Sequence, residues 1–203
     1  MQDLPLILAI TGASGAVYAV RLLEVLLEKG REVHLMISPS GAAVVKQELG
    51  RDVDIERFDL RSLLPFAAAK ISPNQVHYHH YQNFMAPPAS GSFLTGGMVV
   101  CPCSGSTLSG IAHASSNNLI QRSADVQLKE RRKLILVPRE TPLSIVHLDN
   151  MRKAAEAGAV ILPAMPGWYH GVKSLQDLVD FVVARILDQL GVPHELMKRW
   201  GSE

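Results

Sequence analysis

Serine and threonine hydroxyl groups follow several apolar segments of this chain, each time just before a predicted helix. The hydroxyl-bearing segments are TGASGA at 11–16, SPS at 38–40 and CSGST at 103–107. Glycine lets the backbone approach a ligand closely, and the free N–H groups at a helix start attract an anion such as phosphate. A tight turn in which Ser14 caps a helix would explain the first segment equally well. Three such turns together indicate a crevice that binds a phosphorylated ligand.

Cationic side chains offer a second chemistry, because guanidinium and ammonium groups bind phosphate. Arg122 and Lys129 share one face of a predicted helix, and the apolar residues between them indicate that part of this face is buried. Arg139 and Glu140 follow a later apolar run, and Arg185 flanks the apolar stripe of the last predicted helix. The alternatives are a solvated charged helix, a surface Arg–Glu pair and an arginine that reaches solvent. Partly buried cations need an anionic partner, which a bound phosphate would provide.

Two clusters of potential metal ligands lack the spacing of a metal site. In His77-Tyr78-His79-His80, alternation would put two histidines on one strand face, but no Asp, Glu or Cys stands nearby at ligand spacing. Cys101 and Cys103 match neither a zinc site nor a redox CxxC pair, and small apolar residues at a strand end explain them. We therefore expect no metal site. Hydrolysis also lacks support, because there is no GxSxG elbow and no Ser-His-Asp order.

Apolar runs that alternate with helical patterns must position these residues. The apolar runs are Leu6–Ile10, Glu32–Ile37, Met98–Cys101, Leu134–Val137 and Val160–Leu162. Helical periodicity covers Ala16–Glu28, Gly41–Leu49, Thr107–Ala114, Leu143–Ala157 and Leu175–Leu190. This alternation predicts an α/β fold, a three-layer, Rossmann-like, doubly wound parallel sheet with ligands at the carboxyl ends of its strands. The lack of GxGxxG, and of an acidic residue after the second run, favours a mononucleotide over a dinucleotide.

The length of 203 residues suits a single domain, 1–203. Residues 52–75 break the rhythm with at most a short helix, and residues 81–97 are typical of a long ordered loop, which often carries function. Residues 191–203 begin with Gly-Val-Pro, which ends the last helix. We expect this tail to be an oligomerisation segment that packs on a neighbouring subunit, although docking on its own domain is equally physical.

Composition excludes several classes of protein. The formal net charge is only +1 and Lys and Arg are spread along the chain, so the basic stripe of a nucleic-acid binder is missing. Aromatic residues make up 5% of the chain, too few for base-stacking platforms. The first apolar run is too short to span a membrane, and Met1–Pro5 has no positive region of a signal peptide. We expect a cytoplasmic protein that binds neither nucleic acid nor membrane.

Six motifs in order, taken together, resemble the UbiX-type flavin prenyltransferases. They are TGASGA at 11–16, APPASGS at 86–92, CPCSGSTLSGIAH at 101–113, NNLIQRSADVQLKERR at 117–132, LVPRETP at 136–142 and PAMPGWYH at 163–170. The match covers nearly the whole chain, with residues 50–82 as the weak part. The resemblance implies that reduced FMN is alkylated by dimethylallyl monophosphate without a metal. The product, prenylated FMN, is the cofactor of UbiD-type decarboxylases, and members of the family typically form homododecamers with sites at subunit interfaces.

The resemblance also implies a set of site residues. The positions expected to hold FMN are Gly12, Ala13, Ser14, Ser38, Ser104, Gly105, Ser106, Thr107 and Arg139. The positions expected to bind the dimethylallyl phosphate are Phe84, Ser90, Arg122, Lys129, Glu140, Tyr169 and Arg185. The expected catalytic residues are Ser14, Glu48, Lys129 and Glu140, and Glu48 matches the acid that assists proton loss after ring closure.

Phe84 departs from the family pattern, since many members have tryptophan before MAPPASGS. A phenyl ring is a weaker cation–π partner than indole, so the position of the prenyl group or its rate of transfer is expected to differ.

Two other functions remain compatible with the sequence. One is a flavin-dependent decarboxylase of the phosphopantothenoylcysteine type, although its PxMN motif is missing. The other is a non-catalytic carrier that stores FMN for a partner decarboxylase.

Overall fold

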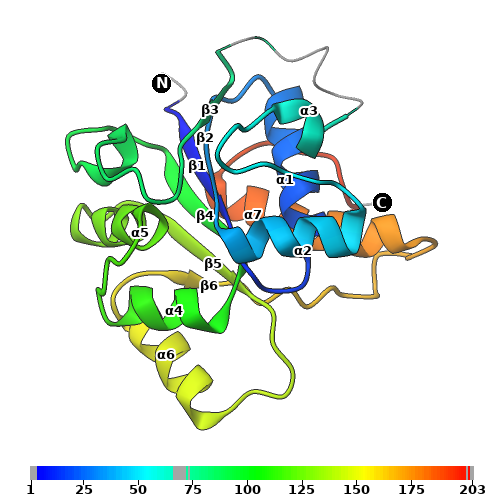
Figure 1. The fold of residues 1–203 in the computed structure, drawn as a ribbon. Helices are drawn as coiled ribbons and strands as arrows, with labels where there is room; N and C mark the ends of the chain where they lie inside the picture. The colour runs from blue at the N-terminus through cyan, green and yellow to red at the C-terminus, as the bar shows by residue number, and fades with distance from the viewer. Residues whose placement is uncertain (1–3, 66–71, 73, 200, 202–203) are drawn as a thin grey trace.

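The computed structural model describes residues 4–65, 72, 74–199 and 201 (Figure 1). Its centre is a six-stranded parallel sheet in the order β3-β2-β1-β4-β5-β6. The strands are β1 (Leu6–Ile10), β2 (Val33–Ile37), β3 (Val76–Tyr78), β4 (Gly97–Cys103), β5 (Leu134–Pro138) and β6 (Val160–Ile161). The helices are α1 (Ala16–Glu28), α2 (Pro39–Leu49), α3 (Leu60–Leu63), α4 (Gly105–Ala112), α5 (Leu119–Lys129), α6 (Ile145–Glu156) and α7 (Leu175–Leu190), with a 3₁₀ turn, η2, at Pro87–Ala89.

Helices cover both faces of the sheet, which gives three layers (Figure 1). Helices α1, α2 and α7 pack on one face, and α4, α5 and α6 pack on the other. Every residue of β1, β2, β4 and β5 is buried, because each of these strands is covered on both sides. The predicted single α/β domain with a doubly wound parallel sheet is therefore confirmed.

Most predicted elements are found where periodicity indicated them. The bounds of β1, α1 and α7 agree with the predicted ranges, and the conditional helix within residues 117–132 is α5. Strand β3 was not among the predicted strands, because it has three residues, all only partly buried, and no apolar run marks it. Residues 52–75 contain the one-turn helix α3, and 66–71 and 73 within that stretch lie outside the described residues.

The strand order reverses at the centre of the sheet, where β1 pairs with β2 on one side and β4 on the other. Crossovers leave this point in opposite directions, so the helices that follow β1 and β4 diverge to opposite faces and a crevice forms at the carboxyl ends of these strands. The loops at this edge are those with the hydroxyl-bearing segments. None of the described helices is long and apolar enough to cross a membrane.

The tail after α7 docks, as far as it is described, on its own domain. Gly191 ends the helix with a positive φ of 70°, and Val192 is buried in the core. Asp188 then holds two side chains of the tail, His194 at 3.1 Å and Arg199 at 2.8 Å. Residues 200, 202 and 203 of the predicted oligomerisation segment lie outside the described residues. Packing of this tail on a neighbouring subunit stays a prediction.

Candidate active site

A hollow of ≈ 220 Å³ lies at the carboxyl ends of β1, β2 and β4. Its lining residues are Gly12, Ser38, Pro39, Ser40, Tyr81, Ser104, Ser106, Thr107, Asn118 and Gln121. Sequence analysis had named Gly12, Ser38, Ser104, Ser106 and Thr107 as ligand-binding, and the fold gathers these five from three separate loops. The crevice predicted from strand ends is thus present, with hydroxyl groups on several sides.

Pro39 and Ser40 belong to the predicted hydroxyl-bearing segment 38–40, whereas Tyr81, Asn118 and Gln121 were missed as site residues. Asn118 is the N-cap of α5 and accepts a hydrogen bond from the N–H of Gln121 at 3.0 Å. The Gln121 side chain is almost fully buried, and it accepts a hydrogen bond from the N–H of Asn117 at 2.9 Å. An asparagine just before a helix predicts an N-cap, but nothing in the local sequence pattern indicated that this helix start faces the crevice.

Ser38 and Ser104 each cap a helix that begins at the hollow. The Ser38 hydroxyl accepts from the N–H of Gly41 at 3.0 Å, and the Ser104 hydroxyl accepts from the N–H of Thr107 at 3.3 Å. The Ser104 hydroxyl also lies 3.2 Å from that of Ser106. Two helix N-termini with their positive dipole ends therefore point toward one cavity, which favours an anionic ligand.

Thr11 joins two of the loops that form the hollow. Its buried hydroxyl donates to the carbonyl of Pro102 at 2.7 Å and accepts from the N–H of Ser104 at 2.8 Å. The loop after β1 is thereby tied to the loop after β4 at the point where the strand order reverses. Thr11 was quoted in the first motif but was not assigned a role there.

The residues of this hollow fit FMN. Gly12 lets the loop after β1 pack closely against the start of α2 beside the hollow, because a Cβ there would overlap the Cβ of Ser40. Hydroxyl groups and helix-start N–H groups suit a phosphate, and the side-chain amides of Asn118 and Gln121 suit the polar edge of a heterocycle. Bound FMN would supply the ring atoms that accept a transferred group.

Glu48, not Ser14, satisfies the start of helix α1. The alternative in which Ser14 caps this helix is wrong: the N-cap is Gly15, whose φ is 113° and which has no side chain. Glu48, at the end of α2, accepts from the N–H of Gly15 at 3.0 Å and from that of Ala16 at 2.9 Å. A carboxylate from a distant helix therefore occupies the anion position that the turn creates.

The environment of Glu48 favours its charged form. Partial burial acts to raise the pKa of this carboxyl, but hydrogen bonds from the Ser14 hydroxyl and two backbone N–H groups, with the nearby charge of Arg139, hold that pKa below its usual value. Arg139 also donates from Nε to the carbonyl of Ser14 at 3.3 Å. Three of the predicted site residues, Ser14, Glu48 and Arg139, therefore lie together.

Glu48→Gln is expected to lower the free energy of unfolding by about 0.5–1 kcal/mol at pH 7. This value lies in the lower part of the range for losing a helix cap, because the Glu48 side chain is exposed and solvent weakens its interactions. The pKa of Glu48 is lower in the folded than in the unfolded chain, so its contribution exists above the unfolded pKa and disappears as the pH falls through the folded pKa. Urea unfolding at neutral and acid pH measures it. The free energies of unfolding of the wild type and of Glu48→Gln should converge in acid. A difference between them that is independent of pH would contradict the prediction. Glu195→Gln, an exposed change in the tail, is the control.

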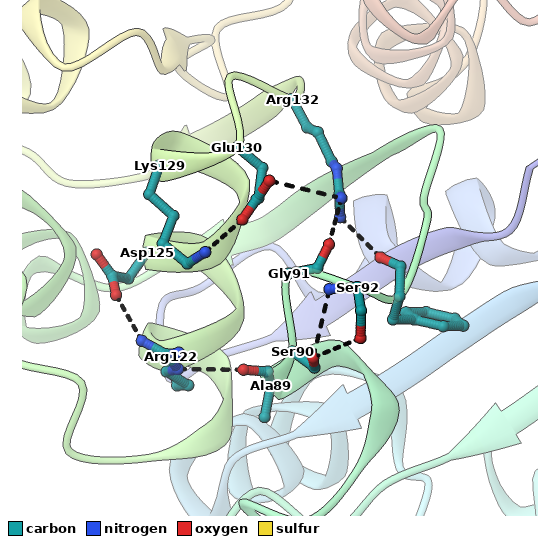
Figure 2. Close-up of polar contacts among 10 residues, drawn as sticks. Ala89, Ser90, Gly91, Ser92, Arg122, Asp125, Lys129, Glu130 and Arg132 are labelled. Carbon is teal, nitrogen blue, oxygen red and sulfur yellow. Dashed lines mark hydrogen bonds and ion pairs between the residues drawn. The ribbon is translucent and has the colours of Figure 1, made fainter.

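Ser90, Arg122 and Lys129 form a second cluster, where the loop after η2 meets α5 (Figure 2). Arg122 donates from Nε to the carbonyl of Ala89 at 3.2 Å and pairs with Asp125 at 2.9 Å. Figure 2 shows the ammonium group of Lys129 paired with the neighbouring carboxylate of Glu130, close to the loop. The fold therefore brings these three predicted phosphate-binding residues together.

Glycine at position 91 makes the close approach of this loop possible. A Cβ on Gly91 would overlap the side-chain ends of Glu130 and Lys129. Arg132 holds the loop from the other side, donating to the carbonyl of Gly91 at 2.5 Å and to that of Phe93 at 2.7 Å (Figure 2). Arg122 of α5 and Arg132, which follows that helix, therefore hold the backbone on both sides of Ser90.

Glu140, Tyr169 and Arg185 line other parts of the surface. Glu140 lies beside a small hollow between the loops after β5 and β6, whereas Arg185 borders a different hollow along α7. Arg185 pairs with Asp188 at 2.6 Å, and the exposed Tyr169 ring meets Phe181 edge-on, with ring centroids 5.8 Å apart. Phe84 is likewise exposed, in the loop before η2. Within one subunit the lining of these hollows includes neither Ser90 nor Lys129.

The premise that no carboxylate accompanies the histidines of 77–80 is wrong. Glu32, which immediately precedes β2, lies with one carboxylate oxygen 3.1 Å from Nε2 of His77 and 3.4 Å from Nε2 of His34. Spacing along the chain did not reveal this neighbour, because β2 and β3 are brought side by side only by the sheet.

Comparison with known proteins assigns the chain to a family. The flavoprotein family model matches residues 1–187. The flavin prenyltransferase UbiX of Halalkalibacterium halodurans is 50% identical over 194 residues, which are 96% of this chain and 92% of that protein. The chain belongs to the UbiX flavin prenyltransferases of the flavoprotein family. The resemblance read from the six motifs is thereby confirmed, and so is the function as a flavin prenyltransferase.

Solved structures share the flavin prenyltransferase fold. AnUbiX (PadA1), crystallised in complex with FMN and dimethylallyl pyrophosphate, is 38% identical with a TM-score of 0.86 over 100% of both chains. A dodecameric FMN-dependent UbiX-like decarboxylase from Escherichia coli O157:H7 is 39% identical with a TM-score of 0.84, covering 98% of this chain and 100% of that one. A PPC decarboxylase mutant is only 15% identical with a TM-score of 0.58, covering 84% of this chain and 86% of that one, which is a likeness of fold alone.

Proposed function

We propose that this flavin prenyltransferase transfers the dimethylallyl group of dimethylallyl monophosphate to reduced FMN and releases prenylated FMN. The C–O bond of the donor breaks and phosphate leaves with its electrons. Carbon bonds form to N5 and the adjacent ring carbon of the flavin, and the proton that is lost balances the departing phosphate. The observation that carries this proposal is a pair of polar sites in one chain: the hydroxyl-lined hollow, and a cluster of cations that the phosphate of FMN alone would not require.

FMN binds, in this proposal, in the hollow at the carboxyl ends of β1, β2 and β4. The residues proposed to hold it are Gly12, Ala13, Ser14, Ser38, Ser104, Gly105, Ser106, Thr107 and Arg139. The two capped helix starts and the close-packed Gly12 support this assignment. The complex of AnUbiX with FMN supports it at the level of the family.

The phosphate of the prenyl donor binds, in this proposal, at Ser90, Arg122 and Lys129. Monophosphate is a poor leaving group, so cations must meet the negative charge that develops as the C–O bond breaks. Lys129 supplies an ammonium group that Glu130 holds beside the loop, and Arg122 supplies a guanidinium that Asp125 and the carbonyl of Ala89 already orient. The allylic cation character is stabilised by π faces, including Phe84, which is exposed where it can meet a ligand.

Glu140, Tyr169 and Arg185 complete the donor site, in this proposal, from a neighbouring subunit. Within one chain, Glu140 and Arg185 line hollows separate from the Lys129 cluster, and Tyr169 lies against Phe181, so their joint action requires a second copy. Large apolar side chains exposed on the loop after β6 and on α6 and α7 support such association: Ile145, Val146, Met165, Trp168 and Leu175. A homododecamer is the proposed assembly, in line with the dodecameric relative, and residues 191–203 are proposed to contribute to the contact.

Glu48 and Ser14 are proposed to handle the proton lost on ring closure. The carboxylate is kept charged by its hydrogen bonds, so it is ready to accept a proton at neutral pH. Glu140 is proposed to act beside Lys129 on the donor. We further propose that no metal takes part in the transfer, that a UbiD-type decarboxylase receives the product, and that the protein is cytoplasmic.

Anaerobic turnover is the test of this function. The purified protein is mixed with reduced FMN and dimethylallyl monophosphate in the presence of a chelator, and the mass of the flavin is measured. The expected result is a flavin heavier by one five-carbon unit, together with released phosphate. An unchanged flavin mass would overturn the proposal and leave the non-catalytic FMN carrier, for which the same hollow would suffice.

A further inference from the structure

A cluster of imidazole and carboxylate groups lies at the edge of the sheet, formed by side chains of β2, β3 and the residue before β2. Glu32, His34 and His77 each offer one ligand atom, and these three atoms lie within 4.8 Å of one another. His34 and His77 are direct neighbours in the register of β2 and β3. The cluster therefore depends on the pairing of two backbone strands and not on a mobile loop.

Two of the three distances within this cluster are close to those between the ligands of a tetrahedral ion, and the ligand atoms of His34 and His77 lie within 4.8 Å of each other. A Zn²⁺ ion with bonds of roughly 2.0–2.1 Å has ligand atoms about 3.3 Å apart. The Glu32 oxygen lies 3.1 Å from Nε2 of His77 and 3.4 Å from Nε2 of His34, which are close to that edge length. Two imidazoles and one carboxylate would leave a fourth position for water.

His79 is placed to orient His34. Its Nε2 lies 2.8 Å from Nδ1 of His34, the ring nitrogen that faces away from Glu32. A histidine that binds metal through Nε2 carries its proton on Nδ1 and needs an acceptor there, which His79 provides. The His34 side chain is only 6% exposed and packs against the ring of Phe93, so its orientation is held on several sides.

We propose that Glu32, His34 and His77 form a binding site for one divalent zinc-class cation, with His79 as a positioning residue. Imidazole ligands select Zn²⁺ and its transition-metal neighbours over Mg²⁺ and Ca²⁺, which prefer oxygen. The ligands stand at the start of β2 and beside the edge strand β3, whereas the flavin hollow stands at the carboxyl ends of the strands. The ion would therefore stabilise the fold and take no part in prenyl transfer.

The structural consequence is a cross-link between β3 and the rest of the sheet. Strand β3 has three residues and, among the residues that the structure describes, pairs with β2 alone, so few hydrogen bonds hold it. An ion shared by His34 and His77 joins the two strands through side chains. His34 also contacts Phe93, whose carbonyl accepts from Arg132, so the ion would reach the segment that follows Ser90.

Zinc binding to the full-length chain tests the proposal. The protein is stripped with a chelator, exchanged into chelator-free buffer and titrated with ZnCl₂ against a chromogenic chelator. The expected result is about one zinc ion per chain, with nitrogen and oxygen ligands at roughly 2.0 Å by X-ray absorption. Hydrogen exchange at 76–78 should slow when zinc is added. A wild-type chain that retains no zinc would overturn the proposal.

Four variants separate this site from adventitious binding. Glu32→Gln and His77→Ala change partly exposed side chains and should reduce zinc affinity by more than about 100-fold, whereas His79→Ala should reduce it by about 10–100-fold with the ligand count unchanged. His113→Ala removes an exposed histidine elsewhere and should leave the affinity unchanged. Circular dichroism without metal checks that each variant is folded. Binding that survives both Glu32→Gln and His77→Ala, or that is lost equally in His113→Ala, would contradict the assignment.

Discussion

Lys129→Met is expected to lower kcat for prenyl transfer by about 10²- to 10³-fold, the usual cost of removing one preorganised donor to a developing charge. The affinity for FMN should be unchanged, because Lys129 lies on α5 beside the donor loop and does not line the flavin hollow. Methionine keeps the length and apolar stem of lysine, so the packing of the helix end is preserved.

The surroundings of Lys129 explain why the effect should be large. Glu130 pairs with the ammonium group and Gly91 allows the loop to approach it, so the charge is held next to Ser90 before any donor binds (Figure 2). Arg122 is already engaged by Asp125 and by the carbonyl of Ala89, and it cannot move to replace the missing charge without breaking those contacts.

Single-turnover prenylation and a separate FMN titration measure these two quantities. Lys29→Met is the matched control, an exposed lysine that follows α1 on the opposite face of the sheet, and it should behave like the wild type. Normal turnover in Lys129→Met, or loss of FMN binding with normal turnover once FMN is replenished, would show that the role given to Lys129 is wrong.

Thr11→Val is expected to destabilise the protein by about 1–3 kcal/mol and to weaken FMN binding about tenfold. Valine has the shape of threonine, but at the buried position 11 it leaves the partly buried N–H of Ser104 without its acceptor, and an unsatisfied group of that kind costs this much. The loop after β4 would relax to recover a partner, and the Ser104 cap that faces the hollow would move with it.

Thermal unfolding and flavin titration check this prediction. In a chain of this length, 1–3 kcal/mol corresponds to a fall in Tm of roughly 2–12 °C. Thr11→Ser is the matched control, because it keeps the hydroxyl that donates to Pro102 and accepts from Ser104. Serine should restore most of the FMN affinity. Equal losses in the valine and serine variants would mean that the methyl group, and not the hydroxyl, is what matters.

Local patterns in the sequence determined most of the fold. Continuous apolar runs such as Leu6–Ile10 can be buried only between two helical layers, and the helices between them have stripes that match one face. The carboxyl ends of parallel strands meet at one edge, so the hydroxyl groups after β1, β2 and β4 could be grouped without knowledge of the strand order. The six motifs determined the family for the same reason: each is a short, contiguous segment.

Contacts between distant segments were decided only by the tertiary structure. Glu48 reaches the start of α1 because α2 packs beside it, and Glu32 meets His77 because β3 pairs with β2. Thr11 became a bridge only when β4 took its place next to β1. No periodicity within one segment encodes such pairs, since they depend on the order of strands and on how helices pack. The sequence by itself therefore shows which groups can do chemistry, and the packing of the sheet decides which of these groups come into contact.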